Sequence, residues 1–483
     1  MPGRHLLLPT GGAAGQRPRP RWCKRDPGDG GLPRDALAWS SPRVLGPAAP
    51  SPCRGRACHG RGPPMKTDVA VIGTGLSALA AARTIQQSGR QVVLVWPGLS
   101  SLYFLFATVD VIGYPTATST EPVADPAEAV ARLITREPTH PYARAGIDAV
   151  HASTRLMLEW FKEAGLAWEG ALNRNFLLPT ATGTPKPCCL APASMTAGDL
   201  SRPEPIVLCG FTGYRDFAPE LAASNLERQW GAAAVSAVRV TAPGYGPDRL
   251  FTSVDLARSF EDATFRDAVA AELRERVGDG VRIGVPGVLG LTRPNETFAA
   301  FQRAVGHPIF EIPTVPPSVI APRLFDRLRK HLQEAGIEII WAAPGHAAEV
   351  TDGRCRSILL KAAGHELPVE AAAYVVALED WVDGAFRAGV HTVRDPFFHQ
   401  PIAWNKVPTD RTAESLFSTQ PFEQVGYALT DRLQPADENG KPLARNVFCA
   451  GGAMAGYDPT GTKSRGGMAI ATGYRAAQEA LAA

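Results

Sequence analysis

The chain lacks cysteines and histidines at the spacings that bind metals. Among its 483 residues, eight cysteines are scattered without a C-x-x-C pair, and ten histidines form no group at zinc-ligand spacing. A chain of this length also has no need of a disulfide framework to hold its core together. We therefore predict no metal or iron–sulfur site and a reducing compartment.

The main part of the chain also has no excess of basic residues. The net charge is +3, but residues 1–64 hold 11 Lys and Arg against 3 Asp and Glu, so residues 65–483 carry −5. A nucleic-acid-binding domain normally has a basic excess, because its surface follows the phosphates. We therefore predict no nucleic-acid partner.

One uncharged segment is long enough to span a membrane, but turn-forming residues interrupt it. Residues 91–109 are 19 residues without a charge, but Pro97-Gly98 and Ser100-Ser101 interrupt them. A strand, a turn and a second element fit this stretch better than one helix. We therefore predict no transmembrane segment of the chain's own.

Residues 1–64 have too little apolar sequence to build a core. They hold 11 Gly and 12 Pro interleaved with arginines. The apolar patch at residues 6–8 is shorter than the roughly 7 residues that a signal peptide needs. We interpret the segment as a disordered leader that is not part of the native protein, and we place the start of the fold at Met65.

A glycine-rich turn follows the first predicted strand, at residues 67–72, and opens a helix. The turn consists of six residues, Gly73, Thr74, Gly75, Leu76, Ser77 and Ala78. Gly73 permits a tight turn, Gly75 lets a phosphate approach the backbone, and Ala78 allows the helix to pack closely on the strand. Because the amides of a helix N-terminus favour an anion, we predict that these six residues bind a cofactor.

A second glycine-rich segment follows a predicted buried strand at residues 446–450 and precedes the last helix. A helix N-terminus here suits the negative charge of a reduced flavin, and Asp458 can accept hydrogen bonds from ribityl hydroxyls. The predicted cofactor-binding residues are Gly451, Gly452, Asp458, Gly466, Gly467 and Met468. Lys463 and Arg465 are the candidates for a catalytic role, through their positive charge. A solvated pair of cations and an Asp that caps its own turn are the alternatives.

A carboxylate for an adenosine ribose is missing. About 20 residues after such glycines, a dinucleotide site usually has Asp or Glu, whereas this chain has Val95-Trp96-Pro97. Either other groups hold the adenosine or the ligand is a mononucleotide. We therefore predict FMN as the cofactor, with FAD as the alternative.

Five stretches resemble, in order, the B subunit of the anaerobic, quinone-linked glycerol-3-phosphate dehydrogenase, one of the two-domain FAD/FMN flavoprotein dehydrogenases. They are residues 68–79, 140–142, 211–217, 311–318 with Arg323-Leu324, and 452–467. Together they extend over nearly the whole chain after Met65. The resemblance implies an α/β fold with a Rossmann-like flavoprotein nucleotide-binding domain, discontinuous in sequence, and an inserted α+β cap domain.

We place the domain boundaries where the sequence pattern changes. Residues 65–118 are the first part of the flavin-binding domain, residues 119–315 are the inserted cap or substrate domain, and residues 316–483 are the second flavin-binding part. The two glycine-rich segments then belong to one domain, although they lie at opposite ends of the sequence.

The same resemblance implies a flavin-binding subunit that works beside a catalytic FAD subunit and a membrane-attached iron–sulfur subunit. The complex would oxidise sn-glycerol 3-phosphate to dihydroxyacetone phosphate in anaerobic respiration and pass the electrons towards quinone. The chain would be cytoplasmic and held at the inner face of the cell membrane by its partner subunits. The alternatives are a free-standing FAD-dependent oxidoreductase of another substrate and a non-catalytic scaffold that has lost its flavin.

Two segments depart from the family pattern. Residues 104–107, Phe-Leu-Phe-Ala, stand where the family has a small Ser/Gly-rich turn before an Asp, here Asp110. Residues 377–380, Ala-Leu-Glu-Asp, stand where many flavoproteins have Ala-Thr-Gly-Gly. Bulky and acidic residues close to an anionic ligand weaken its binding, and this favours the scaffold alternative.

Several other side chains are weaker candidates for a functional role. They are His140 and His307 as proton-transfer groups, Cys188-Cys189 as a vicinal disulfide or covalent flavin site, and Lys186 and Arg215 as ligands of a substrate phosphate. Surface histidines, free thiols and solvated charges are the plainer interpretations.

Removal of residues 1–64 is expected to leave the protein unchanged, because their Gly and Pro content leaves them no core to join. A chain that starts at Met65 should match the full chain in yield, Tm and cofactor content. A chain that starts at Val69, inside the first predicted strand, is the control and should fold poorly. An insoluble or inactive Met65 chain would place the leader in the native protein.

Overall fold

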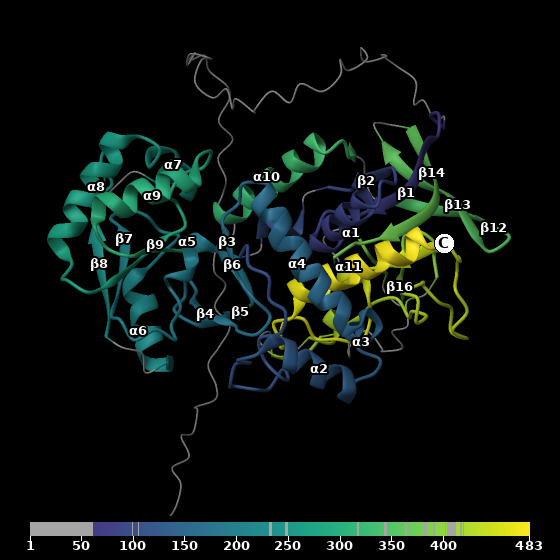
Figure 1. Cartoon of the computed structure of the whole chain (residues 1–483), viewed down its shortest axis with the longest axis horizontal. Helices are drawn as coiled ribbons and strands as arrows, with labels where there is room; N and C mark the ends of the chain where they lie inside the picture. Colours follow the sequence, from purple (N-terminus) through teal and green to yellow (C-terminus); the bar gives the residue numbers. More distant parts are fainter. Residues whose placement is uncertain are drawn as a thin grey trace, which may run out of the picture. The chain divides into compact units, whose positions relative to one another are not determined.

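The computed structural model describes most of the chain from Arg61 onwards (Figure 1). The described residues are 61–98, 100–104, 106–230, 234–246, 250–315, 318–341, 345–362, 365–379, 384–389, 392–400, 402, 412–415, 418 and 420–483. The prediction for leader residues 1–60 lies outside them. Arg61 forms ion pairs with Glu349 and Glu366, at 2.7 and 3.6 Å, between half-exposed side chains. Such pairs contribute at most about 1 kcal/mol, so a chain that starts at Met65 should tolerate their loss.

Segments far apart in the sequence build one parallel sheet. Its order is β11-β2-β1-β14, with β17 beside the end of β14. The strands are β1 (Met65–Ile72), β2 (Val92–Trp96), β11 (Glu338–Trp341), β14 (His365–Val376) and β17 (Val447–Cys449). All of β2 is buried, as in parallel strands that are covered on both faces. The sheet confirms the predicted α/β class and its Rossmann-like core, discontinuous in sequence.

Two antiparallel strands extend this sheet beyond β14. β12 (Gly345–Thr351) and β13 (Arg354–Ala362) form a hairpin, and β13 also pairs with the first half of β14. Between them, Asp352 and Gly353 have φ values of 51° and 69°, in the left-handed region that a tight two-residue hairpin turn needs. An Asp-Gly pair between strand-like segments predicts a hairpin at residues 352–353, and the structure confirms it.

Two helices from opposite ends of the described chain pack together on the sheet. α1 (Leu76–Gln87) follows the first glycine turn, and α11 (Arg465–Leu481) lies beside it (Figure 1). Val69 and Val71 of β1 join their core, whereas the alternating residues Ala70 and Ile72 join a second core on the other face of the sheet. At Gly473 the contact is so close that an added Cβ would lie 2.3 Å from the Ser77 carbonyl oxygen.

The other predicted helices are present with changed boundaries. The apolar spacing predicts helices over residues 152–165 and 319–335. The structure has α4 (Ile147–Glu163), which begins five residues earlier, and α10 (Ile320–Glu334), which matches. The single helix predicted over residues 255–277 is wrong, because the structure has α7 (Ser253–Ser259) and α8 (Ala263–Arg276) there. The Asp262 carboxylate accepts a hydrogen bond from the Phe265 amide at 2.9 Å and so caps a new helix.

The inserted segment contains a parallel sheet of its own. Its order is β10-β9-β7-β8, all parallel, with an independent hydrophobic core. The elements are β7 (Ile206–Phe211), α6 (Pro219–Trp230), β8 (Val235–Val240), β9 (Arg282–Pro286), α9 (Pro294–Val305) and β10 (Ile309–Ile312). This alternation of strands and helices was not predicted from the sequence.

Short elements complete the described residues. They are α2 (Pro126–Arg136), α3 (Pro141–Ala145), β3 (Trp168–Gly170), β4 (Phe176–Pro179), β5 (Pro185–Cys188), β6 (Leu190–Pro192), α5 (Ala193–Thr196), β15 (Arg387–Ala388), β16 (Val393–Arg394), and 3-10 turns at Ser101–Phe104, Pro421–Gln424 and Gly451–Ala453. β2 and the first of these turns confirm the strand, turn and second element predicted for residues 91–109. Within the described part of the chain, no helix has the length and apolar character that crossing a membrane requires.

A buried asparagine fastens β17 to the hairpin side of the sheet. The Asn446 side chain is 1 % exposed. Its Oδ1 accepts from the Cys355 amide at 2.8 Å, and its Nδ2 donates to the carbonyl oxygens of Cys355 and Ala372, both at 2.9 Å. One side chain therefore satisfies three backbone groups of β13 and β14.

Asn446→Ala is expected to lower the free energy of unfolding by about 3 kcal/mol, because each buried polar group left without a partner costs about 1–3 kcal/mol. Urea unfolding of the full chain measures the change. Asn439→Ala, at an exposed turn, is the control and should stay within about 0.5 kcal/mol. Equal stability of the two variants would mean that Asn446 does not fasten β17.

Candidate functional site

A cavity of about 420 Å³ lies at the N-terminal end of α11. The β4–β5 hairpin, the segment around residues 104–110 and the loop before α11 form its walls. Its charged lining residues are Lys186, Lys463, Arg465 and Asp110. The cavity therefore brings both catalytic candidates, Lys463 and Arg465, together with Lys186, which the sequence suggested as a phosphate ligand.

Lys186 is held in place inside this cavity. Its ammonium donates to the Asp110 carboxylate at 2.5 Å and to the Thr108 hydroxyl at 2.8 Å, and its side chain is 13 % exposed. The Phe106 ring centroid lies 5.7 Å from the ammonium. These contacts hold the ammonium in one position. A solvated surface lysine has no such contacts.

Lys463 combines an unusual backbone with partial burial. Its φ of 50° lies in the left-handed region, which costs a non-glycine residue free energy and is typical of functional sites. Burial lowers the pKa of its ammonium, and the neighbouring Lys186 charge lowers it further. The charge at this position is therefore costly, and an anion in the cavity would stabilise it.

Threonine hydroxyls line the same cavity, and sequence reasoning missed them. They belong to Thr108, Thr180, Thr182, Thr184 and Thr460. The Thr180 hydroxyl lies 2.7 Å from that of Thr184 and 3.2 Å from that of Thr182. Residues 180–184 form the turn between β4 and β5, where the Thr180 amide donates to the Thr184 carbonyl oxygen at 3.0 Å. The three threonines close together around Gly183 were the available signal.

The predicted site residues around α11 have different surroundings in the structure. Gly466 lines the cavity, and Met468 is fully buried. The Gly467 amide donates to the Asp110 carbonyl oxygen at 2.8 Å, so it serves the packing of α11. Asp458 accepts from the Gly461 amide at 2.8 Å and therefore caps its own turn, one of the two roles considered for it.

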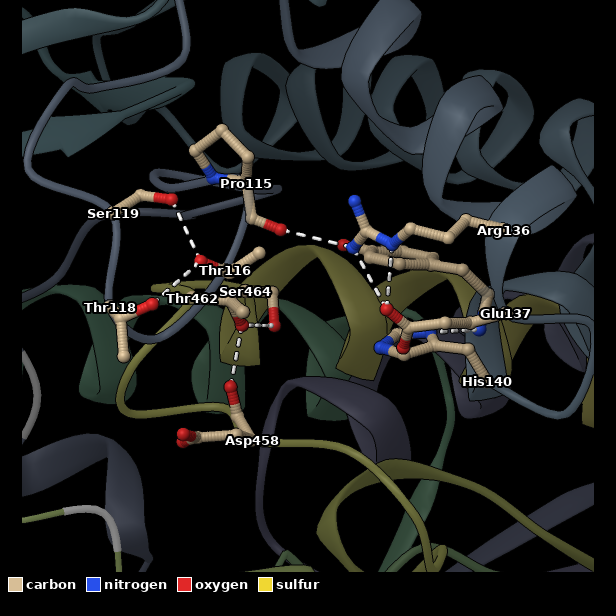
Figure 2. A network of polar contacts seen from close by, with 11 residues as sticks. Pro115, Thr116, Thr118, Ser119, Arg136, Glu137, His140, Asp458, Thr462 and Ser464 are labelled. Carbon is tan, nitrogen blue, oxygen red and sulfur yellow. Dashed lines mark hydrogen bonds and ion pairs between the residues drawn. The ribbon is translucent and has the colours of Figure 1, made fainter.

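Backbone hydrogen bonds tie the loop before α11 to residues 113–114, and Figure 2 shows the side chains around this loop. The Thr462 hydroxyl donates to the Asp458 carbonyl oxygen at 2.5 Å and lies 2.8 Å from the Ser464 hydroxyl. The Thr462 carbonyl oxygen accepts from the amides of Gly113 and Tyr114 at 2.9 and 3.0 Å. These bonds fix the loop that carries Lys463.

His140 has a structural role near this loop. Its Nδ1 accepts from the Tyr142 amide at 3.1 Å and so caps the start of α3. Burial lowers the pKa of its imidazole to about 4, while the Glu137 carboxylate opposes the shift. The ring is therefore neutral at neutral pH, and its acceptor nitrogen is already used.

The remaining candidates lie away from the cavity or are buried. His307 stands between α9 and β10, and Arg215 is exposed after β7, so neither lines the cavity. Cys188 and Cys189 are buried free thiols, and burial raises the pKa of both, that of Cys189 to about 12.

The first glycine turn is closed by a carboxylate of the chain itself. Glu379, just after β14, accepts from the Ser77 amide at 3.0 Å and from the Ser77 hydroxyl at 2.6 Å. Gly73 is needed for packing, since a Cβ there would lie 2.0 Å from the Ala377 carbonyl oxygen. In this arrangement the turn does not fit a flavin phosphate, because the Glu379 carboxylate stands at the start of α1 and already accepts from the Ser77 amide and hydroxyl. Asp380, which the sequence grouped with Glu379, and Leu105 lie outside the described residues.

Trp96 occupies the place of the missing ribose carboxylate. It ends β2, is 1 % exposed, and packs against Phe325 and Trp341 at centroid distances of 5.0 and 5.4 Å. The position belongs to the hydrophobic core, so it offers no acceptor to an adenosine ribose.

Comparison with known proteins identifies relatives over nearly the whole chain. The family described as "FAD binding domain" matches residues 68–467. A probable B subunit of the anaerobic glycerol-3-phosphate dehydrogenase from Halobacterium salinarum is 32% identical over 435 residues, 87% of this chain and 99% of the relative. The corresponding B subunit from Vibrio cholerae is 28% identical over 441 residues, 86% of this chain and 97% of that protein. The matched family supports a flavin and names FAD, so the preference for FMN is not supported by it.

Solved structures resemble the chain more distantly. The 3-ketosteroid Δ1-dehydrogenase from Sterolibacterium denitrificans is 12% identical with a TM-score of 0.40, over 86% of this chain and 100% of that chain. A flavocytochrome c3 fumarate reductase is 11% identical with a TM-score of 0.37, over 87% of this chain and 79% of that chain.

The free energy of unfolding is expected to fall as the pH is lowered from about 6.5 towards 4, because His140 takes up a proton at a higher pH in the unfolded chain than in the folded one. The unfolded imidazole takes up a proton near pH 6.5 and the folded one only near pH 4, so the stability present above about pH 6.5 is lost towards pH 4. Between about pH 7.5 and 5 the loss should be about 2 kcal/mol.

His140→Asn is the matched variant, because asparagine keeps an acceptor at the helix cap and does not titrate. Urea unfolding at both pH values measures the two proteins. The variant should lose about 2 kcal/mol less than the wild type. An equal loss would assign the pH dependence to other groups.

Proposed function

This chain belongs to the family of the anaerobic glycerol-3-phosphate dehydrogenase B subunits, and we propose that it is the corresponding subunit of such an enzyme. The enzyme oxidises sn-glycerol 3-phosphate to dihydroxyacetone phosphate and passes the electrons towards quinone. Similarity to curated relatives over 87% of the chain and 99% of the relative supports this proposal.

The α11 cavity is the observation that carries the proposal. It gathers three cations, and two of them stand at the start of a helix that has no acidic residue in its first turn. Positive side chains at a helix N-terminus are unfavourable, because the helix dipole is also positive there. A phosphate dianion removes this cost, so the cavity suits the phosphate group of the substrate.

The residues of the chain bind and orient in this proposal. Lys463 and Arg465 hold the phosphate, and Asp110 keeps Lys186 in position beside them. The threonine hydroxyls offer donors and acceptors to the glycerol hydroxyls. The volume of about 420 Å³ lies within the usual range of small-molecule sites.

FMN is a second candidate for the same cavity, because it also carries a phosphate monoester. Trp96, buried at the end of β2, favours FMN over FAD, since it leaves the adenosine ribose without a carboxylate there. The scaffold alternative is favoured by a different residue, Glu379, whose carboxylate fills the first glycine turn. No described contact favours a free-standing oxidoreductase.

The proposed partners are a catalytic FAD subunit and a membrane-attached iron–sulfur subunit. The relatives are each named as one subunit of a dehydrogenase, and this supports a complex of several chains. The chain would then be cytoplasmic, at the inner face of the cell membrane, and would reach the membrane through its partners.

Lys463→Gln is expected to weaken binding of sn-glycerol 3-phosphate to the full chain about tenfold to a hundredfold, because it removes a charge-assisted hydrogen bond of about 1.5–3 kcal/mol. Titration calorimetry measures the Kd. Arg215→Gln is the matched control, since Arg215 is exposed outside the cavity, and it should bind like the wild type.

The same titration with FMN separates the two phosphate monoesters. Binding of glycerol 3-phosphate that depends on Lys463 supports the substrate site. Binding of FMN alone, with the same dependence, would assign the cavity to the cofactor. If neither ligand binds, or if Arg215→Gln alone weakens binding, the cavity is not the phosphate site.

A further inference from the structure

The glycines predicted to make room for a cofactor make room for Glu379. A Cβ at Gly75 would lie 2.1 Å from Cγ of Glu379, and one at Gly451 would lie 3.1 Å from its Oε2. A Cβ at Gly452 would lie 1.4 Å from its backbone oxygen. At Gly75 and Gly452 a side chain would clash with Glu379, whereas at Gly451 it would first meet the Ser77 hydroxyl oxygen, at 2.5 Å. Two glycines from distant segments are therefore needed to accommodate this one residue.

The Glu379 carboxylate also meets the electrostatic requirement of the turn. The first amides of α1 have no partner within the helix, and the helix dipole makes this end positive. Glu379 brings a negative charge to that end, accepts from the Ser77 amide, and is 4 % exposed. A buried carboxylate with these donors does what a bound phosphate does in a nucleotide-binding turn.

A carboxylate and a diphosphate cannot occupy the turn together. Both are anions that need the same donors, and like charges at one buried position repel strongly. A dinucleotide would bind here only after the Glu379 side chain had left Ser77 and the space between the glycines.

We propose that Glu379 permanently replaces the cofactor phosphate at the α1 turn, and that this chain binds no FAD there. Within the described part of the chain, the α11 cavity then remains the candidate anion site. The inference goes beyond the proposed function and stands apart from it, since the chain can bind glycerol 3-phosphate at α11 while the α1 turn is closed.

An anion-rescue experiment on the full chain tests this replacement. Glu379→Gly removes the carboxylate and frees the donors of Ser77, and Glu379→Gln keeps the size of the side chain without its charge. The wild type and both variants are melted with and without pyrophosphate, the diphosphate part of FAD. Pyrophosphate should raise the Tm of E379G several degrees more than that of the wild type, in which it reaches only the α11 cavity.

Ligand binding to the same proteins gives an independent measurement. E379G should bind ADP about tenfold more tightly than the wild type, and E379Q should show a smaller gain. The wild type should release no FAD when it is denatured and its supernatant is chromatographed. If E379G does not fold, the comparison of E379Q with the wild type decides, and equal ADP affinity of these two overturns the proposal.

Near-stoichiometric FAD in the wild type, with the same amount in E379Q, would mean that Glu379 leaves the turn and would also overturn the proposal. Glycerol 3-phosphate binding is measured in parallel. Its absence in the wild type contradicts the proposed function alone, whereas FAD bound to the wild type contradicts the present inference alone.

Discussion

The pairing of β14 is the constraint on which the rest of the structure depends. Its residues 369–376 pair with β1, residues 365–370 with β13, and residues 374–376 with β17. These pairings bring together three parts of the chain that are far apart in sequence. The same strand delivers Glu379 to the α1 turn, so the register of β14 with β1 fixes where that carboxylate stands.

Among the described residues, the α1 turn and the α11 cavity both suit an anion, and they differ in the charges that the chain itself supplies there. At α1 the chain supplies its own carboxylate, which is buried against Ser77. At α11 it supplies only cations and one carboxylate, Asp110, which is engaged with Lys186. The favourable charge balance is therefore already reached at α1 without a ligand, whereas at α11 the proposed phosphate ligand would supply it.

Much of the nucleotide-binding fold could be predicted because its signals are local. The glycine turn after β1, the Asp352-Gly353 hairpin and the apolar spacing of α10 each depend on a few neighbouring residues. The inserted parallel sheet was not identified, because its strands pair across the helices that separate them in sequence, and no local pattern shows which strands are neighbours. The break between α7 and α8 was missed because the helical spacing of apolar residues continues across it. Its one marker is Asp262, which caps the start of α8.

The sequence by itself determined β1 with its glycine turn, α10, the family pattern and the departure at residues 377–380, because backbone preferences and residue spacing act within a short stretch. It also identified Lys463, Arg465 and Lys186 as separate candidates. Only the tertiary structure decided that these cations share one cavity and that Glu379 fills the turn at Gly75. Such meetings depend on strand register and on helix packing between distant segments, and no local pattern carries that information.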